Sequence, residues 1–106
     1  MFDIPAGSVI CSWTGWIRPP DRASYTAYLE RPGLAGCRAT PGNLGATMVF
    51  RDLPDGRCAV RTISFWRTHA DIAAFAGEDI ELTAFYVQDD ASLIDRELRV
   101  AHVDVA

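Results

Sequence analysis

The sequence predicts a single α+β domain in which two helices cover one face of a four-stranded antiparallel sheet. A turn of the Asp-Gly type separates two strand-like runs in the middle of the chain, which is the signature of a hairpin. Similar runs lie near the start and the end of the chain, and an amphipathic segment lies on either side of the hairpin. The 106 residues, of which 49% are hydrophobic, leave room for one domain, residues 1–106, with a core of its own.

The first half of the chain is predicted to form a strand and a helix. Residues 9–17 are rich in β-branched and aromatic side chains, which favour a strand. Residues 19–21 are expected to begin a helix, because a first turn tolerates Pro and an acidic residue suits the helix dipole there. A Pro-Gly pair at residues 32–33 ends this helix. The next segment, residues 37–43, is expected to be an irregular loop or a short bent strand.

The hairpin and the second helix follow. Strands are expected over residues 46–52 and 58–66, joined by the Pro-Asp-Gly turn. Thr68 is the expected N-cap of the next helix, and Asp71 lies three residues later, as in a capping box. This helix is expected to continue through residues 79–86.

The chain is predicted to end in a short helical turn and a closing strand. An Asp pair at residues 89–90 would cap a turn through residues 93–94, and residues 98–105 alternate enough to form a strand. The resulting order, βαββαβ, is the ferredoxin-like arrangement, in which right-handed crossovers place both helices on one face of the sheet. The other face would expose Val, Phe and Trp side chains. We therefore expect a homodimer in which a second copy of the sheet covers them.

Charge and cysteine usage argue against several kinds of partner and site. The formal net charge is −4 and all ten basic residues are scattered Arg, so no nucleic acid partner is expected. Cys11, Cys37 and Cys58 lie in or beside apolar runs without metal-ligand spacing. They are expected to be reduced structural thiols, with a reactive thiol or an intermolecular bridge as the alternative, and no metal site is expected. A cytoplasmic protein with no membrane partner is expected, because neither a signal-peptide pattern nor a membrane-length apolar run is present.

Short stretches over nearly the whole chain carry a resemblance to a known family. They are Ser-Trp-Thr-Gly-Trp at 12–16, Pro-Gly-Asn at 41–43, Ser-Phe-Trp at 64–66, Phe-Ala-Gly-Glu-Asp-Ile at 75–80, Phe-Tyr at 85–86, Asp-Asp at 89–90 and Val-Ala-His-Val at 100–103. With them the chain resembles the antibiotic-biosynthesis-monooxygenase branch of the dimeric α+β barrel superfamily. The resemblance implies a dimeric α+β barrel with a ligand cavity in each protomer, between the helices and the sheet.

The resemblance also bears on cofactor and reaction. Members include cofactor-free oxygenases of polycyclic aromatic substrates, heme-degrading enzymes and small isomerases. Heme-degrading members carry an Asn on the first strand and a ligand His on the second helix, where this chain has Trp-rich sequence and the pair Phe85-Tyr86. Heme is therefore disfavoured, and no cofactor is expected. The leading hypothesis is a cofactor-independent oxygenase or tailoring enzyme for an aromatic or polyketide-like small molecule. A non-oxidative isomerase or cyclase and a non-catalytic ligand-binding dimer are the alternatives.

Three residues are candidates for acid-base chemistry. His102 is the candidate base, because imidazole exchanges protons near neutral pH. Arg38 is the candidate stabiliser of an enolate or phenolate, and Tyr86 the candidate proton relay. The alternatives are a His hydrogen-bonded within the sheet or at the dimer seam, an Arg in a salt bridge and a packed Tyr. His69, in the first turn of the second helix, is expected to be a solvated surface residue.

Aromatic side chains dominate the predicted substrate pocket. The candidate substrate-binding residues are Trp13, Tyr28, Trp66, Phe75, Phe85 and Asp90. Strand alternation places Trp13 and Trp16 on opposite faces of the sheet, so both cannot line one cavity. Core or dimer packing is the alternative for the aromatic residues, and helix capping is the alternative for Asp90.

Overall fold

The computed structural model describes residues 4–30, 34–76 and 93–106. Three sequence predictions concern residues outside these ranges: the helix stop at 32–33, the helix continuation over 79–86 and the capping Asp pair at 89–90. All structural statements below refer to the described residues. Within them, no helix is long and apolar enough to cross a membrane.

The antiparallel sheet predicted from the sequence is confirmed. Its strands are β1 (Val9–Ile17), β2 (Asn43–Asp52), β3 (Cys58–Trp66), β4 (Leu93–Arg96) and β5 (Ala101–Asp104). The order across the sheet is β2-β3-β1-β4, with β5 also paired to β1, and every pairing is antiparallel. The strands β1 and β3 have the predicted bounds, and β2 begins three residues earlier than predicted. This is the ferredoxin-like strand order.

The fourth position of the sheet is filled by two short strands. The predicted helical turn at residues 93–94 is wrong, because Leu93 begins β4 and packs into the core. The predicted closing strand, residues 98–105, is shorter, because the continuous strand there is β5, Ala101–Asp104, which pairs with β1. Glu97 bridges the gap between the two strands: its side-chain Oε1 accepts from Thr14 N at 2.7 Å, and its own N–H donates to Thr14 O at 2.9 Å. The carbonyl oxygen of Glu97 also accepts from the indole Nε1 of Trp13 at 2.7 Å.

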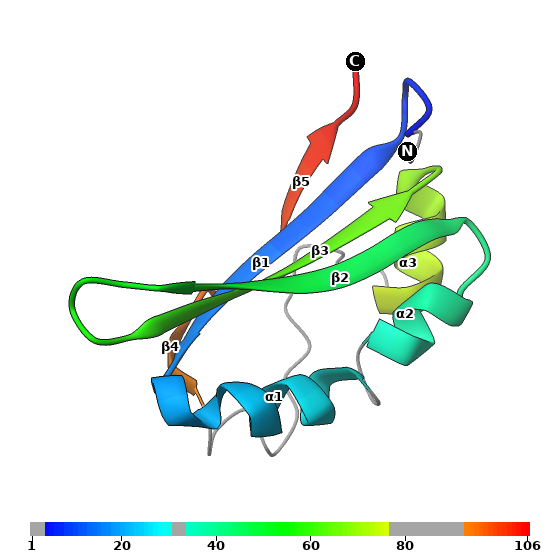
Figure 1. The fold of residues 1–106 in the computed structure, drawn as a ribbon. Coiled ribbons are helices and arrows are strands. Elements are labelled where there is room, and N and C mark those ends of the chain that lie inside the picture. Colours follow the sequence, from blue (N-terminus) through cyan, green and yellow to red (C-terminus); the bar gives the residue numbers. More distant parts are fainter. Residues whose placement is uncertain (1–3, 31–33, 77–92) are drawn as a thin grey trace.

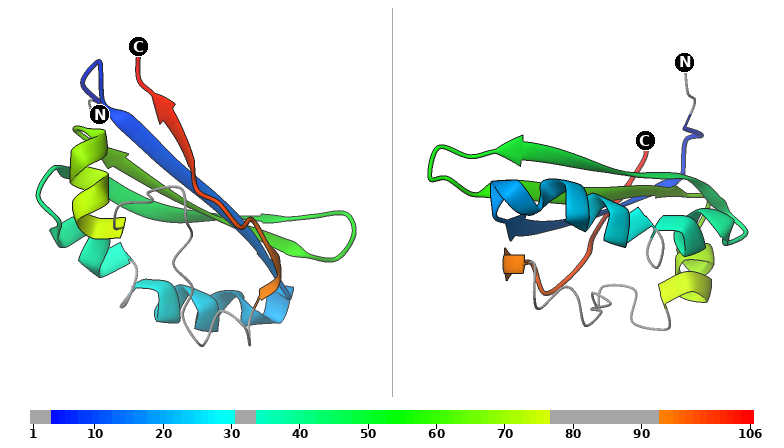
Figure 2. Two further views of the ribbon diagram at one scale, coloured as in Figure 1. Left: turned by 180° about the vertical axis from the view of Figure 1, so that it is seen from behind. Right: turned by 60° about the horizontal axis from the view of Figure 1, so that its bottom comes forward.

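The helices lie on one side of the sheet (Figures 1 and 2). A 3-10 turn, Pro19–Asp21, leads into α1 (Arg22–Leu29), as the Pro-rich helix start predicts. The prediction of a loop or bent strand over residues 37–43 is wrong, because α2 (Ala35–Ala39) occupies its first part. This five-residue helix is too short to give a periodic signal, and it is held by burial of Leu34 and Cys37 at positions i and i+3.

The third helix, α3 (His69–Ala76), begins with the predicted capping pair. Asp71 N donates to Thr68 Oγ1 at 3.1 Å, and the Thr68 hydroxyl donates to Asp71 Oδ2 at 2.9 Å. The Asp71 carboxylate also packs against the backbone of Gly42, in the loop before β2. Gly42 has φ +89°, and a Cβ atom there would overlap the Asp71 side chain. The loop and the helix start therefore fit together only when residue 42 is Gly.

Gly42→Ala is expected to lower the free energy of unfolding by about 2 kcal/mol, because left-handed backbone strain and overlap with Asp71 add together. Urea denaturation monitored by tryptophan fluorescence measures the loss. Gly56→Ala is the matched control: Gly56 has the same φ of +89° in the hairpin turn, and a Cβ there would meet nothing within 4 Å. Equal losses in the two variants would mean that the contact with Asp71 contributes nothing.

Side chains on the helix side of the sheet form the core, and we call this side the covered face. Two clusters of buried residues lie on it. The first contains Trp13, Ile17, Tyr25, Leu29, Cys58, Val60 and Leu93, and the second contains Val9, Cys11, Cys37, Trp66 and Ile72. Val100 packs against both. The two clusters lie at opposite ends of β1, one under α1 and the other under α2 and α3.

The other side of the sheet carries no helix in the described part of the chain, and we call it the open face. Its side chains alternate with those of the core along each strand. From β1 they include Ile10, Thr14 and Trp16, whereas Trp13 is buried in the core at 6% exposure. The prediction that Trp13 and Trp16 lie on opposite faces is therefore confirmed.

Candidate functional site

A row of polar side chains crosses the covered face at the second core cluster, to which two of its members, Cys11 and Cys37, belong. In the strand register, Cys11 of β1 has Ser64 of β3 as its partner on one side and His102 of β5 on the other. Directly paired residues point to the same face, so these three side chains lie next to one another under the helices. Cys37 of α2 joins the row from above, as its contact with Ser64 shows.

Ser64 is the centre of this polar row. Its hydroxyl oxygen accepts from the indole Nε1 of Trp66 at 2.8 Å and is in hydrogen-bond contact with the thiols of Cys11 and Cys37. Asn43, at the start of β2, donates through Nδ2 to Cys37 Sγ at 3.4 Å. The row is therefore a connected set of donors and acceptors inside an apolar layer.

Burial keeps the two thiols of the row protonated. Desolvation raises the pKa of Cys11 to about 11 and also raises the pKa of Cys37, and the hydrogen bond to Ser64 only partly opposes this in each case. Burial also raises the pKa of Cys58, which lies in the first core cluster. All three cysteines are buried and free, in agreement with the prediction of structural thiols. At neutral pH Cys11 and Cys37 act as weak hydrogen-bond donors.

Iodoacetamide at pH 8 is expected to label the folded protein very slowly. A thiol with a pKa of about 11 is only about one part in a thousand thiolate at that pH, and the sulfur atom is shielded as well. Mass spectrometry after timed quenching measures the labelling, and the same protein in urea should label at all three cysteines within minutes. Rapid labelling of Cys11 or Cys37 in the folded protein would instead support the reactive-thiol alternative.

His102 occupies the β5 end of the row. Its Nε2 atom is buried, and its ring centroid lies 6.2 Å from that of His69, the first residue of α3. His69 Nε2 lies 3.2 Å from Asp104 Oδ1, two residues beyond His102 on the same face of β5. The His69 side chain is 55% exposed, as predicted for a surface residue, but its position beside His102 was not predicted. Only the packing of α3 over β5 brings the two rings together.

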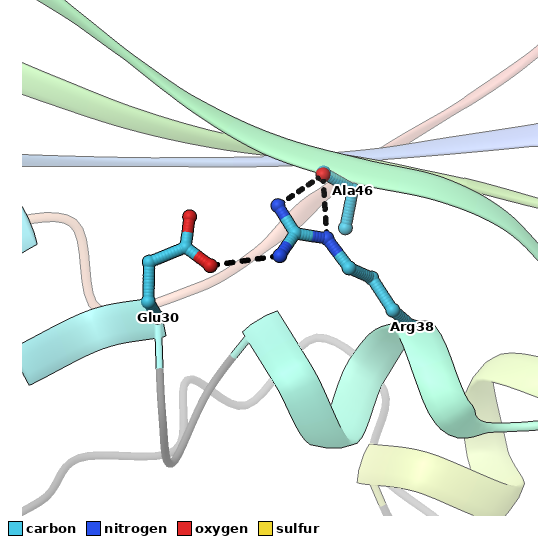
Figure 3. A network of polar contacts seen from close by, with 3 residues as sticks. All are labelled: Glu30, Arg38 and Ala46. Atoms are coloured by element: carbon cyan, nitrogen blue, oxygen red, sulfur yellow. Dashed lines mark hydrogen bonds and ion pairs between the residues drawn. The ribbon is translucent and has the colours of Figure 1, made fainter. Parts of the chain in front are cut away.

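Arg38 lies on α2 next to Cys37, and its guanidinium group points toward β2 (Figure 3). Its Nη1 atom lies 2.7 Å from Glu30 Oε2, and its Nε and Nη2 atoms donate to Ala46 O at 3.0 and 2.8 Å. These contacts tie α2 to β2 and to the end of α1. They correspond to the salt bridge that the sequence left open as the alternative. The role of Arg38 as an anion stabiliser stays a prediction.

The candidate aromatic residues flank the polar row without surrounding a single cavity. Trp13 lies in the first core cluster, and Tyr28 packs against that cluster. Trp66 lies in the second cluster, and its ring centroid is 6.0 Å from that of Phe75. Along the strands, Trp66 is two residues from Ser64, and Trp13 is two residues from Cys11 on the opposite side of the row. The Trp66 indole therefore borders the polar row, whereas the Trp13 indole folds over Gly15, away from Cys11. The other candidates, Tyr86, Phe85 and Asp90, lie outside the described residues.

The arrangement defines a ferredoxin-like α+β protein with a polar row between its helices and its sheet, and the Trp66 indole borders this row. Such a site can exchange a proton through imidazole and can donate hydrogen bonds through a hydroxyl and two thiols. His102, Cys11 and Ser64 are brought together, and Arg38 is held at one side of them. Of the site, the sequence missed Cys11, Cys37, Ser64 and His69. Strand alternation predicts which face of the sheet a side chain is on. It does not predict which residues of neighbouring strands are paired, and this pairing is what brings Cys11 and Ser64 together.

Solved structures share this fold. A candidate antibiotic biosynthesis monooxygenase from Bacillus cereus matches with a TM-score of 0.64 at 11% identity, over 94% of each chain. The protein PA3566 from Pseudomonas aeruginosa matches with a TM-score of 0.61 at 12% identity, over 99% of each chain. A candidate antibiotic biosynthesis monooxygenase from Chloroflexus aurantiacus matches with a TM-score of 0.56 at 15% identity, over 93% of each chain. No protein-family model and no curated protein sequence matches the chain. The likeness confirms at the level of fold the resemblance noted from the sequence.

Proposed function

We propose that this protein is a cofactor-independent oxygenase or tailoring enzyme that acts on an aromatic or polyketide-like small molecule by acid-base chemistry. The observation that carries the proposal is the position of His102 on the covered face, in a polar row bordered by Trp66. An imidazole with a buried Nε2 atom, in a row that also contains an indole contact, suits an aromatic substrate with an acidic O–H or C–H group. The shared fold with two candidate antibiotic biosynthesis monooxygenases supports the same class of reaction.

In the proposed reaction His102 removes a proton from the substrate and leaves a phenolate or carbanion. This anion adds dioxygen at the deprotonated carbon and, after protonation, gives a hydroperoxide. Loss of the second hydrogen of that carbon breaks the O–O bond, so one oxygen atom stays as a carbonyl, the other leaves as water, and the CH₂ group of the substrate supplies all the electrons. The thiol of Cys11 is the register neighbour of His102 and can donate a hydrogen bond to the developing negative charge, and the hydroxyl of Ser64 lies on the other side of Cys11. Arg38 can contribute only if it gives up Glu30 or Ala46. Tyr86 keeps its predicted role as a proton relay.

Oxygen uptake with hydroxylated polycyclic aromatics separates this proposal from its alternatives. Oxygen consumption in proportion to product formation, absent under argon, supports the oxygenase. Equal product formation under argon would overturn the oxidative step and indicate an isomerase or cyclase that uses the same base. Thermal stabilisation by these compounds without any turnover would overturn the enzyme proposal and indicate a binding protein.

The open face supports the proposal of a homodimer. Its half nearest the chain termini is apolar: Ile10, Phe65 and Val103 lie side by side in the register of β3, β1 and β5, and Ile63 follows in the next row. Val103 is 55% exposed in the single chain. A second copy placed on this half by a two-fold axis would remove the apolar surface from water.

Val103→Asp is expected to shift the protein from dimer to monomer, because it places a charge in the centre of the proposed interface. Sedimentation velocity at micromolar concentration measures the two species. Ala74→Asp, which adds the same charge to an exposed position on α3, is the matched control and should leave the dimer intact. A protein that is monomeric before any substitution would contradict the proposed interface.

A further inference from the structure

The middle of β3 is less tightly covered on the helix side than its two ends. Alternate residues of a strand share a face, so Val60, Thr62, Ser64 and Trp66 all lie on the covered face. Val60 is 0% exposed and Trp66 is 1% exposed, because each belongs to a core cluster. Thr62 and Ser64, between them, are only half-buried, and so is Met48, the register partner of Thr62 on β2. The two core clusters therefore leave a strip of partly exposed side chains between them.

The indole of Trp13 leaves the Thr62 end of this strip next to the polar row. Trp13 of β1 is the register partner of Thr62 on the side opposite to β2. Its ring folds toward Gly15, where a Cβ atom would lie 2.6 Å from Trp13 Cη2, and its Nε1 donates to Glu97 O at 2.7 Å. The ring is therefore directed away from the polar row, so it does not separate Thr62 from that row.

Thr62 carries an uncommitted hydroxyl group on the strip. This hydroxyl forms no hydrogen bond within the part of the chain that the structure describes. Its oxygen atom is also not fully buried, so water or a ligand can reach it. A hydroxyl in this position can therefore donate to a substrate atom without giving up a partner in the protein.

The stronger donors nearby are already engaged. The Ser64 hydroxyl accepts from Trp66 Nε1 at 2.8 Å and is in contact with two thiols. The guanidinium group of Arg38 binds the Glu30 carboxylate and the carbonyl oxygen of Ala46 (Figure 3). Each of these groups would have to break a contact before it could bind a substrate oxygen, and the Thr62 hydroxyl would not.

Strand register sets the separation between Thr62 and His102. Ser64, Cys11 and His102 are register partners across β3, β1 and β5, and Thr62 is two residues from Ser64 along β3. Two strand spacings across and two residues along place the backbones of Thr62 and His102 about 12 Å apart. Contacts of about 3 Å at each end leave about 6 Å for the substrate between them. A rigid ring that carries an acidic C–H group and a conjugated oxygen on opposite sides suits this separation.

We propose that Thr62 donates a hydrogen bond to the carbonyl oxygen of the substrate and stabilises the enolate that forms when His102 removes a proton. This inference rests on the proposed function and narrows its substrate class to aromatic ketones whose CH₂ group and carbonyl lie across a ring from each other. As the proton moves to His102, the C–H electron pair moves through the ring to the carbonyl oxygen, where Thr62 meets the developing charge. The enolate then returns the electron pair to the carbon that adds dioxygen.

The test compares the parent protein with Thr62→Val, using anthrone and dihydroanthracene as probes. Both probes have three rings and a reactive CH₂ group, but only anthrone has a carbonyl across the central ring. Quenching of tryptophan fluorescence under argon measures binding. Thr62→Val is expected to bind anthrone about fivefold more weakly than the parent does and to bind dihydroanthracene equally well. In air, kcat for anthrone, measured by oxygen uptake above the uncatalysed rate, should fall at least tenfold.

Matched variants separate the hydroxyl from the rest of the side chain. Valine is as β-branched as threonine and favours strands equally, so Thr62→Val should keep the urea midpoint of the parent. Thr62→Ser retains the hydroxyl and should retain most of the affinity and activity. Thr47→Val makes the same change at an exposed position of β2 on the open face and should bind and turn over anthrone as the parent does.

The infrared carbonyl band of bound anthrone reports the contact directly. A hydrogen bond weakens the C=O bond, so the band should lie at lower frequency in the parent protein than in Thr62→Val. An identical band and affinity in the two proteins, or no binding of anthrone to the parent, would overturn the inference. A loss of kcat in Arg38→Gln but not in Thr62→Val would also overturn it and would assign the enolate to Arg38.

The same measurements distinguish this inference from the proposed function. Oxygen uptake that is unchanged in Thr62→Val would overturn the role of Thr62 and leave the oxygenase in place. Binding and a carbonyl band that depend on Thr62, without oxygen uptake by the parent, would support the contact with the ketone and overturn the oxygenase.

Discussion

Gly15→Val is expected to lower the free energy of unfolding by about 3 kcal/mol, the largest loss expected from any single glycine of the sheet. Gly15 lies on the covered face of β1, and the indole of Trp13 folds over it. A Cβ atom at position 15 would lie 2.6 Å from Trp13 Cη2 and 2.8 Å from Leu93 Cδ2. Valine favours strands, so propensity alone would predict a gain in stability. The overlap outweighs it, because both neighbours are buried and cannot move aside.

Two further variants test this cause. Trp13→Phe removes the ring atoms that a Cβ at position 15 would meet, so the loss caused by Gly15→Val should be smaller in the Trp13→Phe background. Gly36→Ala is the control: its nearest neighbour would be Phe75 at 3.7 Å, an ordinary contact, and alanine should stabilise α2 slightly. Urea denaturation of the parent, Gly15→Val, Trp13→Phe and the double variant gives the coupling energy between positions 13 and 15. A loss from Gly15→Val that is identical in both backgrounds would contradict the overlap.

His102→Ala is expected to lower kcat by about a hundredfold or more, because a positioned general base contributes about 10²- to 10⁴-fold. KM should change little, since the Trp66 indole that borders the row remains in place. The measurement is steady-state oxygen uptake with whichever hydroxylated aromatic the parent protein turns over. Circular dichroism and the urea midpoint must show that the variant is folded, because His102 is partly buried in the sheet.

His69→Gln is the matched control for this prediction. It removes the other imidazole, whose ring lies 6.2 Å from that of His102 but is more than half exposed. We expect His69→Gln to retain activity within about threefold of the parent. Any change in kcat would come from a shift in the position of the His102 ring, because His69 is not the base in this proposal. If the two variants lose activity equally, or if only His69→Gln loses it, the assignment of His102 as the base is wrong.

Elements with strong local signals were predicted well. The hairpin was recognised from its Asp-Gly turn, and the bounds of β1 and β3 agree with those expected from β-branched and aromatic residues. The start of α3 was predicted from Thr68 and Asp71, whose reciprocal hydrogen bonds form within four residues. Each of these signals depends only on neighbours in the chain, so no knowledge of the fold was needed.

Elements stabilised by distant contacts were missed. The short helix α2 persists because Leu34 and Cys37 are buried and Arg38 binds Glu30 and Ala46, and none of these contacts leaves a periodic pattern in five residues. The strand β4 replaces the expected helical turn because Leu93 completes the core beside Trp13 and Gly15. In both places tertiary packing overrides local preference.

The chain's own residues were enough to determine the fold class, the βαββαβ order, the opposite faces of Trp13 and Trp16 and the buried character of the cysteines. These features follow from period, turn chemistry and composition, which are properties of short segments. Tertiary structure alone decided that His102, Cys11 and Ser64 form one polar row and that His69 approaches it. These groupings depend on strand register and helix placement, which join residues tens of positions apart and are settled only when the sheet and its helices pack together.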